Sequence, residues 1–188
     1  MSFAQYPRLG VLLCIVLLAG CATRPKPAPK PVPTPGPKPS FWAGDGVAGA
    51  PSIVVDIGDQ RAYFYKGEKL VGESKISTGR KGFETAMGSY KVIQKDKDHV
   101  SNLYGDYVDE AGEVVKSNVD VSRDPAPEGA TFRGAKMPYF LRFYAGYGLH
   151  AGRVPDHRAS HGCVRLPRAM AEHFFQNAPY GTPVTVQE

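Results

Sequence analysis

The sequence predicts a mainly β domain with one principal helix, running from about residue 51 to the C-terminus. Short runs rich in β-branched and aromatic residues alternate with Gly- and Asp-containing turns, a pattern typical of strands joined by tight connections. Only one segment, close to the C-terminus, carries apolar residues at helical spacing,. The stretch is long enough to bury a single core.

The first half of the domain is expected to open as a β-meander. Strands are predicted at residues 52–57, 61–66 and 70–77, with turns at residues 58–60 and 66–69,. Strand character returns at residues 85–92. Residues 94–134 are polar and rich in Asp and Gly, with little periodicity. So long a loop inside a compact domain indicates a functional lid or binding loop, the alternative being a disordered insertion.

The second half is expected to contain two strands, a helix and a last strand. Strands at residues 137–143 and 147–150 would place His150 at a strand end. Pro167 suits the first turn of a helix because its missing N–H costs nothing there. Residues 169–177 continue the helix, with Met170, Phe174 and Phe175 expected in the core and His173 on the surface,. Residues 181–186 form the last strand.

Residues 1–20 are expected to be an export leader. Arg8 precedes an apolar run at residues 9–18 that is too short for a membrane-spanning helix. Leu18-Ala19-Gly20-Cys21 resembles the bacterial lipobox, in which the cysteine is diacylated and becomes the new N-terminus. Several acyl chains would hold the protein firmly on a bilayer. Ordinary secretion with a free Cys21 is the alternative.

Residues 21–50 are expected to link this anchor to the domain at 51–188. Prolines alternate with other residues between positions 25 and 39, which favours a polyproline II spacer of roughly 60 Å. Five of the 23 Lys and Arg lie before residue 41, where there is no Asp or Glu, so 18 basic residues balance 18 acidic ones in the remainder. The basic character therefore belongs to the linker, and nucleic-acid binding by the domain is not expected.

The candidate site is the stretch from residue 150 to 165. Cys163 is the only cysteine outside the leader and lipobox, and a lone thiol in an exported protein indicates reactivity. His150, His157 and His161 lie close by in the sequence, and an imidazole can hold the proton of an attacking thiolate. A zinc site is the alternative, but this spacing fits no familiar zinc module.

His150 followed by Ser160-His161-Gly162-Cys163-Val164-Arg165 resembles the signature of the L,D-transpeptidase (YkuD-type) catalytic domain. Further matching pieces lie in the same order at residues 77–79, 85–90, 137–139 and 181–184. The chain departs from the family where Ala86-Met87 replace the usual Pro-x and where Pro167-Arg168 follow the signature. The resemblance implies a β-sandwich of mixed sheets, with the principal helix after the catalytic turn.

The resemblance also implies the chemistry. Cys163 would attack a tetrapeptide stem of peptidoglycan, release D-Ala and pass the acyl group to an amine, giving a 3-3 cross-link. His150 would accept and donate the proton, oriented by the carbonyl of Ala151 as a carboxylate does in other triads. Hydrolysis of the acyl-enzyme by a carboxypeptidase or endopeptidase, and a non-catalytic wall-binding lipoprotein, are the alternatives.

Other residues are assigned around this pair. His161 would lower the pKa of the thiol or shape the pocket, and Gly162 would let the turn present backbone N–H groups to an oxyanion. Substrate-binding roles are expected for Arg165, Ser160 and Tyr139, with a structural role as the alternative for Arg165 and bracing of the turn a further role for Ser160.

His99 and His157 are expected to be solvated loop residues. We expect no metal or cofactor, a monomer, and a location in the cell envelope facing the periplasm, with Ala22 favouring the outer membrane.

Overall fold

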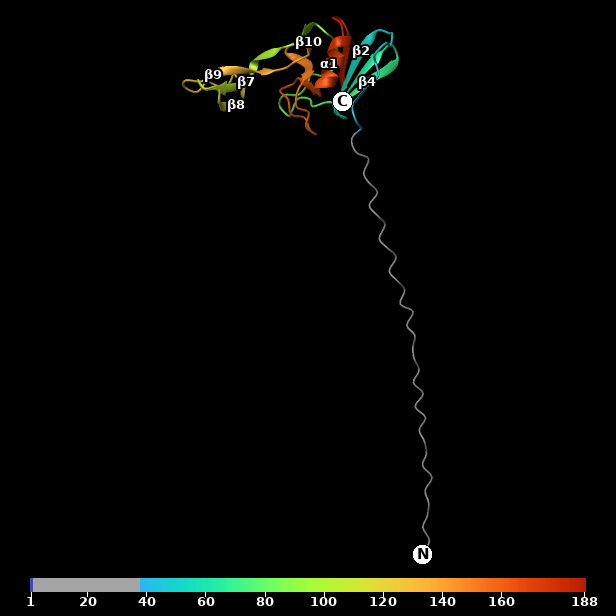
Figure 1. Ribbon diagram of the computed structural model, residues 1–188, viewed down its shortest axis with the longest axis horizontal. Coiled ribbons are helices and arrows are strands. Elements are labelled where there is room, and N and C mark those ends of the chain that lie inside the picture. Colours follow the sequence, from blue (N-terminus) through green and yellow to red (C-terminus); the bar gives the residue numbers. More distant parts are fainter. Residues whose placement is uncertain (2–37) are drawn as a thin grey trace. The chain divides into compact units, whose positions relative to one another are not determined.

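The computed structural model describes Met1 and residues 38–188 (Figure 1). The predicted leader, the lipidation site at Cys21 and most of the proline-rich spacer lie outside the described residues. Among the described residues, no helix is both long and apolar enough to cross a membrane.

A mixed six-stranded sheet forms one side of the body. Its order is β1-β4-β3-β2-β13-β5, and the strands are β1 (Phe41–Trp42), β4 (Lys69–Lys75), β3 (Arg61–Lys66), β2 (Pro51–Asp56), β13 (Pro183–Gln187) and β5 (Gly88–Lys91). The predicted meander corresponds to β2, β3 and β4, which pair antiparallel. The C-terminal β13 lies parallel to β2.

A second sheet carries the candidate site. Its order is β12-β11-β10-β6, and the strands are β12 (Val164–Leu166), β11 (Tyr147–Ala151), β10 (Phe140–Tyr144) and β6 (Gln94–Asp96). Strands β11 and β12 are parallel, and the other two pairs are antiparallel. The predicted strand at residues 137–143 therefore begins later, at Phe140.

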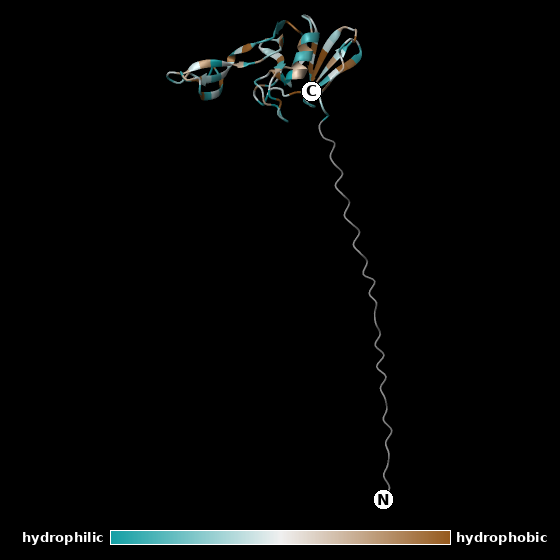
Figure 2. Ribbon diagram, in the orientation of Figure 1, coloured by the Kyte–Doolittle hydropathy of each residue, from teal (hydrophilic) through white to brown (hydrophobic). Residues whose placement is uncertain are grey.

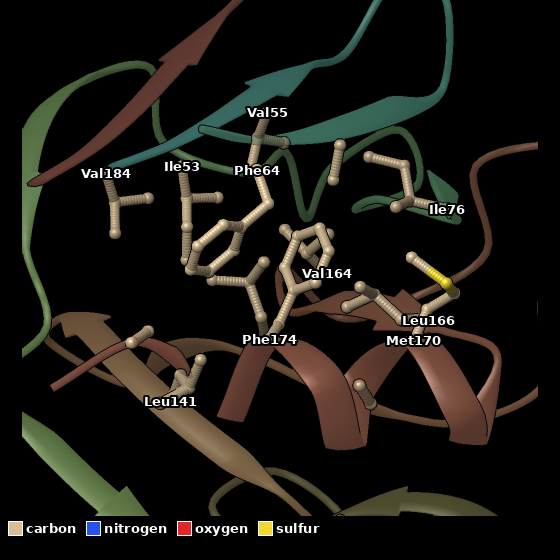
Figure 3. Packing of buried hydrophobic residues seen from close by; sticks show 14 of the residues in the cluster. Ile53, Val55, Phe64, Ile76, Leu141, Val164, Leu166, Met170, Phe174 and Val184 are labelled. Atoms are coloured by element: carbon tan, nitrogen blue, oxygen red, sulfur yellow. The ribbon is translucent and has the colours of Figure 1, made fainter. Parts of the chain in front are cut away.

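The core lies where these two sheets meet the helix α1 (Arg168–Asn177). Figure 3 shows Ile53, Val184 and Phe64 of the six-stranded sheet pointing toward Phe174 of α1, and the rings of Phe64 and Phe174 are 5.1 Å apart, edge to face. Hydrophobic segments gather on the strands beside α1 (Figure 2). The expected mainly β fold with mixed sheets is confirmed, and α1 is the only α-helix of residues 38–188.

The expected loop at residues 94–134 is mostly sheet, so that prediction was wrong. After β6, the strands β7 (Val100–Val108), β8 (Val114–Asp120) and β9 (Thr131–Lys136) form an antiparallel sheet in the order β8-β7-β9. This three-stranded sheet, called the flap below, projects away from the body (Figure 1). β8 and β9 contain few apolar residues in alternation, because most of their residues are exposed.

Folded structure also begins before residue 51. β1 pairs with the edge strand β4, and the Trp42 ring stacks on His173 of α1 at 4.8 Å. The Lys66 Nζ donates to the carbonyl of Gly44 at 2.8 Å, and an Arg61 guanidinium N–H donates to the carbonyl of Lys38. Residues 38–50 therefore belong to the body rather than to the spacer.

Candidate active site

Side chains of the second sheet point alternately into the core and toward the candidate site. Alternate residues of β10, β11 and β12 enter the core, namely Leu141, Phe143, Leu149, Ala151, Val164 and Leu166. Successive side chains of a strand point to opposite faces, so the residues between them share the other face. There Arg142 is opposite Gly148, and His150 is opposite Arg165. The alternation of the sequence thus delivers two arginines and a histidine to one surface.

A cavity of about 530 Å³ lies over this surface. Its lining includes His150 of β11, Arg165 of β12 and Cys163 of the turn before β12. The flap also contributes to the lining, with Tyr104 of β7 and Lys136 of β9. The segment that was expected to be a lid or binding loop therefore lines the cavity, although it is built as a sheet.

His150 is held as a neutral base. Its side chain is buried, and its Nδ1 lies 2.9 Å from the carbonyl oxygen of Ala151. Burial lowers the pKa of His150 from 6.5 to about 4; the bond to Ala151 opposes this, while the charge of Arg165 adds to it. A carbonyl can only accept, so Nδ1 carries the proton and Nε2 is the free acceptor. The ring is therefore in the tautomer that a general base requires.

Cys163 is a neutral thiol at rest. The residue is half-buried, and its Sγ donates to the carbonyl of Gly146 at 3.6 Å. Burial raises the pKa of the thiol, whereas the backbone N–H of Gly148 and the charges of Arg165 and Arg142 act to lower it. A neutral thiol and a neutral imidazole in one cavity indicate that deprotonation accompanies attack instead of preceding it.

Ser160 and Thr85 brace the turn that carries Cys163. The Ser160 Oγ donates to the carbonyl of Cys163 at 2.5 Å and accepts the N–H of Gly162 at 3.0 Å. The Thr85 Oγ1 donates to the Gly162 carbonyl at 2.7 Å. Gly162 has φ +115°, where residues with a Cβ are strained. Because its N–H is committed to Ser160, Gly162 acts on the shape of the turn.

His161 forms part of the cavity wall and contacts the flap. Its ring stacks on Tyr104 of β7 at 4.4 Å and meets the edge of Phe83 at 4.8 Å. Its Nε2 accepts a hydrogen bond from the Arg80 guanidinium at 2.8 Å. Burial, and then the charges of Arg80 and Arg165, lower the pKa of His161 to about 4. A neutral His161 supplies no positive charge to the thiol, so this geometry favours its pocket-shaping role.

Two of the remaining predicted residues line the cavity, and two do not. Arg165 lines the cavity, as does Ser160. Tyr139 is buried in the core, where its ring meets Phe175 at 5.8 Å, and it is not among the residues that line the cavity. His157 is exposed, as expected. Within the described part of the chain, no group of three or more His, Cys, Asp or Glu residues is placed to hold a metal ion.

Several cavity residues were not predicted from the sequence. His99 lines the cavity and is half-buried rather than solvated. It stacks on Phe140 at 4.2 Å, and its Nδ1 lies 3.0 Å from the Asp96 carboxylate. Tyr104, Lys136 and Arg142 also contribute to the lining. For Arg142, the alternation within residues 137–143 was a usable signal, whereas residues of the flap had none.

The fold and the site define a cysteine-containing β domain whose family can be recognised. The family model described as YkuD, the L,D-transpeptidase catalytic domain, matches residues 50–186. The chain therefore belongs to the YkuD family of L,D-transpeptidase catalytic domains.

A curated relative is similar over the same region. The probable L,D-transpeptidase YbiS of Escherichia coli strain K12 is 28% identical over 138 residues, covering 70% of this chain and 43% of the relative. This chain thus spans less than half of the length of that relative.

Solved structures share the fold. An L,D-transpeptidase from Mycobacterium smegmatis aligns with TM-score 0.57 and 19% identity, covering 74% of this chain and 59% of that one. A mutant of the Enterococcus faecium L,D-transpeptidase aligns with TM-score 0.54 and 24% identity, covering 74% and 50%. An LD transpeptidase in complex with imipenem aligns with TM-score 0.56 and 17% identity, covering 73% and 58%.

Proposed function

We propose that this protein is a cysteine acyltransferase that cross-links peptidoglycan stem peptides, with Cys163 as nucleophile and His150 as general base and acid. Membership of the L,D-transpeptidase family supports the reaction class. The observation that carries the assignment is the bond between His150 Nδ1 and the Ala151 carbonyl. It leaves Nε2 of a buried, neutral ring as the acceptor, in a residue that lines the same cavity as the only free thiol of the described residues.

The proposed reaction has two acyl transfers. As Sγ of Cys163 attacks the carbonyl between the third stem residue and D-Ala, Nε2 of His150 takes the thiol proton. The tetrahedral intermediate collapses to a thioester, and the imidazolium returns that proton to the departing amine of D-Ala. An amine of a second stem then attacks the thioester while Nε2 accepts its proton. Collapse forms the new amide, and the proton returns to the sulfur.

One backbone N–H and two guanidinium groups would stabilise negative charge on the sulfur during these steps. The backbone N–H of Gly148 and the guanidinium groups of Arg142 and Arg165 act on the sulfur. Because the thiol starts uncharged, these groups matter most once charge has formed during attack.

Mass spectrometry of the domain with disaccharide tetrapeptide tests the proposal. The expected products are D-Ala and a dimer of the 3-3 mass, and the intact protein should gain one adduct with imipenem. Cys163→Ala should lose both the products and the adduct. An adduct that persists in Cys163→Ala, or product formation that continues without the thiol, would refute the assignment. Tripeptide without dimer would identify hydrolysis of the acyl-enzyme, the alternative function.

We also propose that the mature chain is a monomeric lipoprotein held in the cell envelope, facing the periplasm, through a lipid on Cys21. The support is in the sequence, where Leu18-Ala19-Gly20-Cys21 follows a short apolar run,. In cells fed labelled palmitate, the protein should take up label and stay with membranes. Cys21→Ala should abolish the labelling, while Cys14→Ala should leave it intact. Equal labelling of the wild-type and Cys21→Ala proteins would contradict the proposal.

A further inference from the structure

The cavity beside Cys163 has a one-sided charge. Its lining includes four cationic side chains, Lys136, Arg142, Arg153 and Arg165, and no Asp or Glu. This contrasts with the region of residues 41–188 as a whole, where 18 basic residues balance 18 acidic ones. A cavity lined by one sign of charge raises the local concentration of ligands of opposite sign. The contrast indicates that the cavity takes an anionic ligand.

None of the four cations has a carboxylate partner among the described residues. The other described arginines and lysines do form ion pairs in places, such as Arg133 with Asp106 at 3.9 Å and Lys116 with Asp124 at 2.8 Å. The Nη1 of Arg142 donates to the carbonyl of Ala145 at 2.8 Å, but its Nε is buried without a hydrogen bond. A buried unpartnered donor is costly, so an arriving acceptor at Arg142 would recover that cost.

The cations of the cavity come from separate elements. Arg142 and Arg165 lie on strands β10 and β12 of the second sheet, which also carries His150. Lys136 comes from β9 of the flap. Burial, and then repulsion from Arg80 and Arg153, lower the pKa of Arg165, as expected for cations gathered without counter-charge. Several cations from separate elements suit a ligand with more than one anionic group.

We propose that the cavity selects donor stems whose carboxylates are free over stems in which they are amidated. This inference rests on the proposed function. The carboxylates in question are the α-carboxylate of the second stem residue and the side-chain carboxylate of a diamino-acid third residue. Arg142 and Arg165 would bind the carboxylate close to the thiol, and Lys136 and Arg153 the more distant one. Amidation removes the charge and replaces one of the two acceptor oxygens with an NH₂ donor, which four side chains that only donate cannot satisfy.

Calorimetry with the Cys163→Ala protein tests the selection without turnover. Two synthetic tetrapeptides, identical except that both carboxylates are free or both are amidated, are titrated into it. Each charge-assisted hydrogen bond is worth enough to expect at least tenfold weaker binding of the amidated peptide. The preference should shrink at high salt, because the groups are partly exposed.

Single substitutions of the exposed cations locate the effect. In the same background, Lys136→Gln or Arg153→Gln should reduce the preference for the free peptide about threefold or more, with little change for the amidated peptide. Arg133→Gln is the matched control, because Arg133 lies on β9 as well but pairs with Asp106 and does not line the cavity. It should keep the wild-type preference.

The outcomes separate this inference from the proposed function. Equal binding of the two peptides by Cys163→Ala, with equal turnover by the wild-type protein, would overturn the selection while leaving the acyltransferase assignment intact. Selection for the amidated peptide would do the same. Absence of binding and of turnover with both peptides would overturn both proposals together.

Discussion

Replacing His150 with glutamine is expected to slow acylation of Cys163, by imipenem or by a tetrapeptide, about 10²- to 10⁴-fold. Glutamine is polar and close in size but cannot accept and return a proton. His161 is not expected to take over the role, because its Nε2 accepts the hydrogen bond from Arg80. The thiol itself is not pre-ionised, since burial raises its pKa. The rate is measured by intact-protein mass spectrometry at fixed reagent concentration.

The same histidine sets the acid limit of the reaction. Because burial lowers the pKa of His150 to about 4, the wild-type rate should persist well below pH 6 and fall with a midpoint near pH 4.

The free energy of unfolding should depend on the same proton of His150. The unfolded chain binds this proton near pH 6.5 and the folded chain only near pH 4, so folding free energy is lost as pH falls through that window. The loss from His150 alone is about 3 kcal/mol.

His157→Gln is the control for both effects, because His157 is exposed in the loop between the same two strands. Its acylation rate and its unfolding free energy should follow the wild-type pH curves. Urea unfolding between pH 7 and pH 4 should be less pH-dependent in His150→Gln than in His157→Gln. A His150→Gln protein that acylates at the wild-type rate would remove His150 from the mechanism. A wild-type rate that falls near pH 6.5 would contradict the lowered pKa of His150.

The body of the fold was predictable because its strands each bury one face. Ile53, Val55 and Phe64 alternate with polar residues, and they form the core that these runs predicted. The helix was predictable for the same reason, since Met170 and Phe174 are buried along one side of α1. The sequence signature indicated which residues meet at the site, and Cys163 and His150 do line one cavity.

The flap was not predictable, because its stability does not come from an alternating apolar face. β8 and β9 are largely exposed, so burial does not require apolar residues at every second position of these strands. What fixes the flap near the site is a contact between distant residues, the stack of Tyr104 on His161. Similarly, residues 38–50 look like linker because they are short and rich in Gly and Ala, yet Trp42 docks on α1. Long-range packing of single aromatic residues leaves no local pattern.

Gly162→Ala should damage both the fold and the reactivity of Cys163, although it adds only one methyl group. A Cβ at this position would lie 2.4 Å from Cε1 of Tyr147, and the backbone φ of +115° is strained for alanine,. The turn cannot relax freely, since the Gly162 N–H and carbonyl are held by Ser160 and Thr85. We expect the unfolding free energy to fall by about 1–3 kcal/mol. Displacement of the thiol by even 1 Å should slow acylation about 10²-fold.

Gly112→Ala separates backbone strain from damage to the turn. Gly112 also has a positive φ, +83°, but a Cβ there would meet nothing within 4 Å. Its variant should lose some stability in urea unfolding, through strain alone, and should acylate with imipenem at the wild-type rate. If Gly162→Ala acylated as fast as Gly112→Ala, the shape of this turn would not govern the reactivity of Cys163. A slow Gly162→Ala protein that is still folded would identify the turn as the element that aims the sulfur.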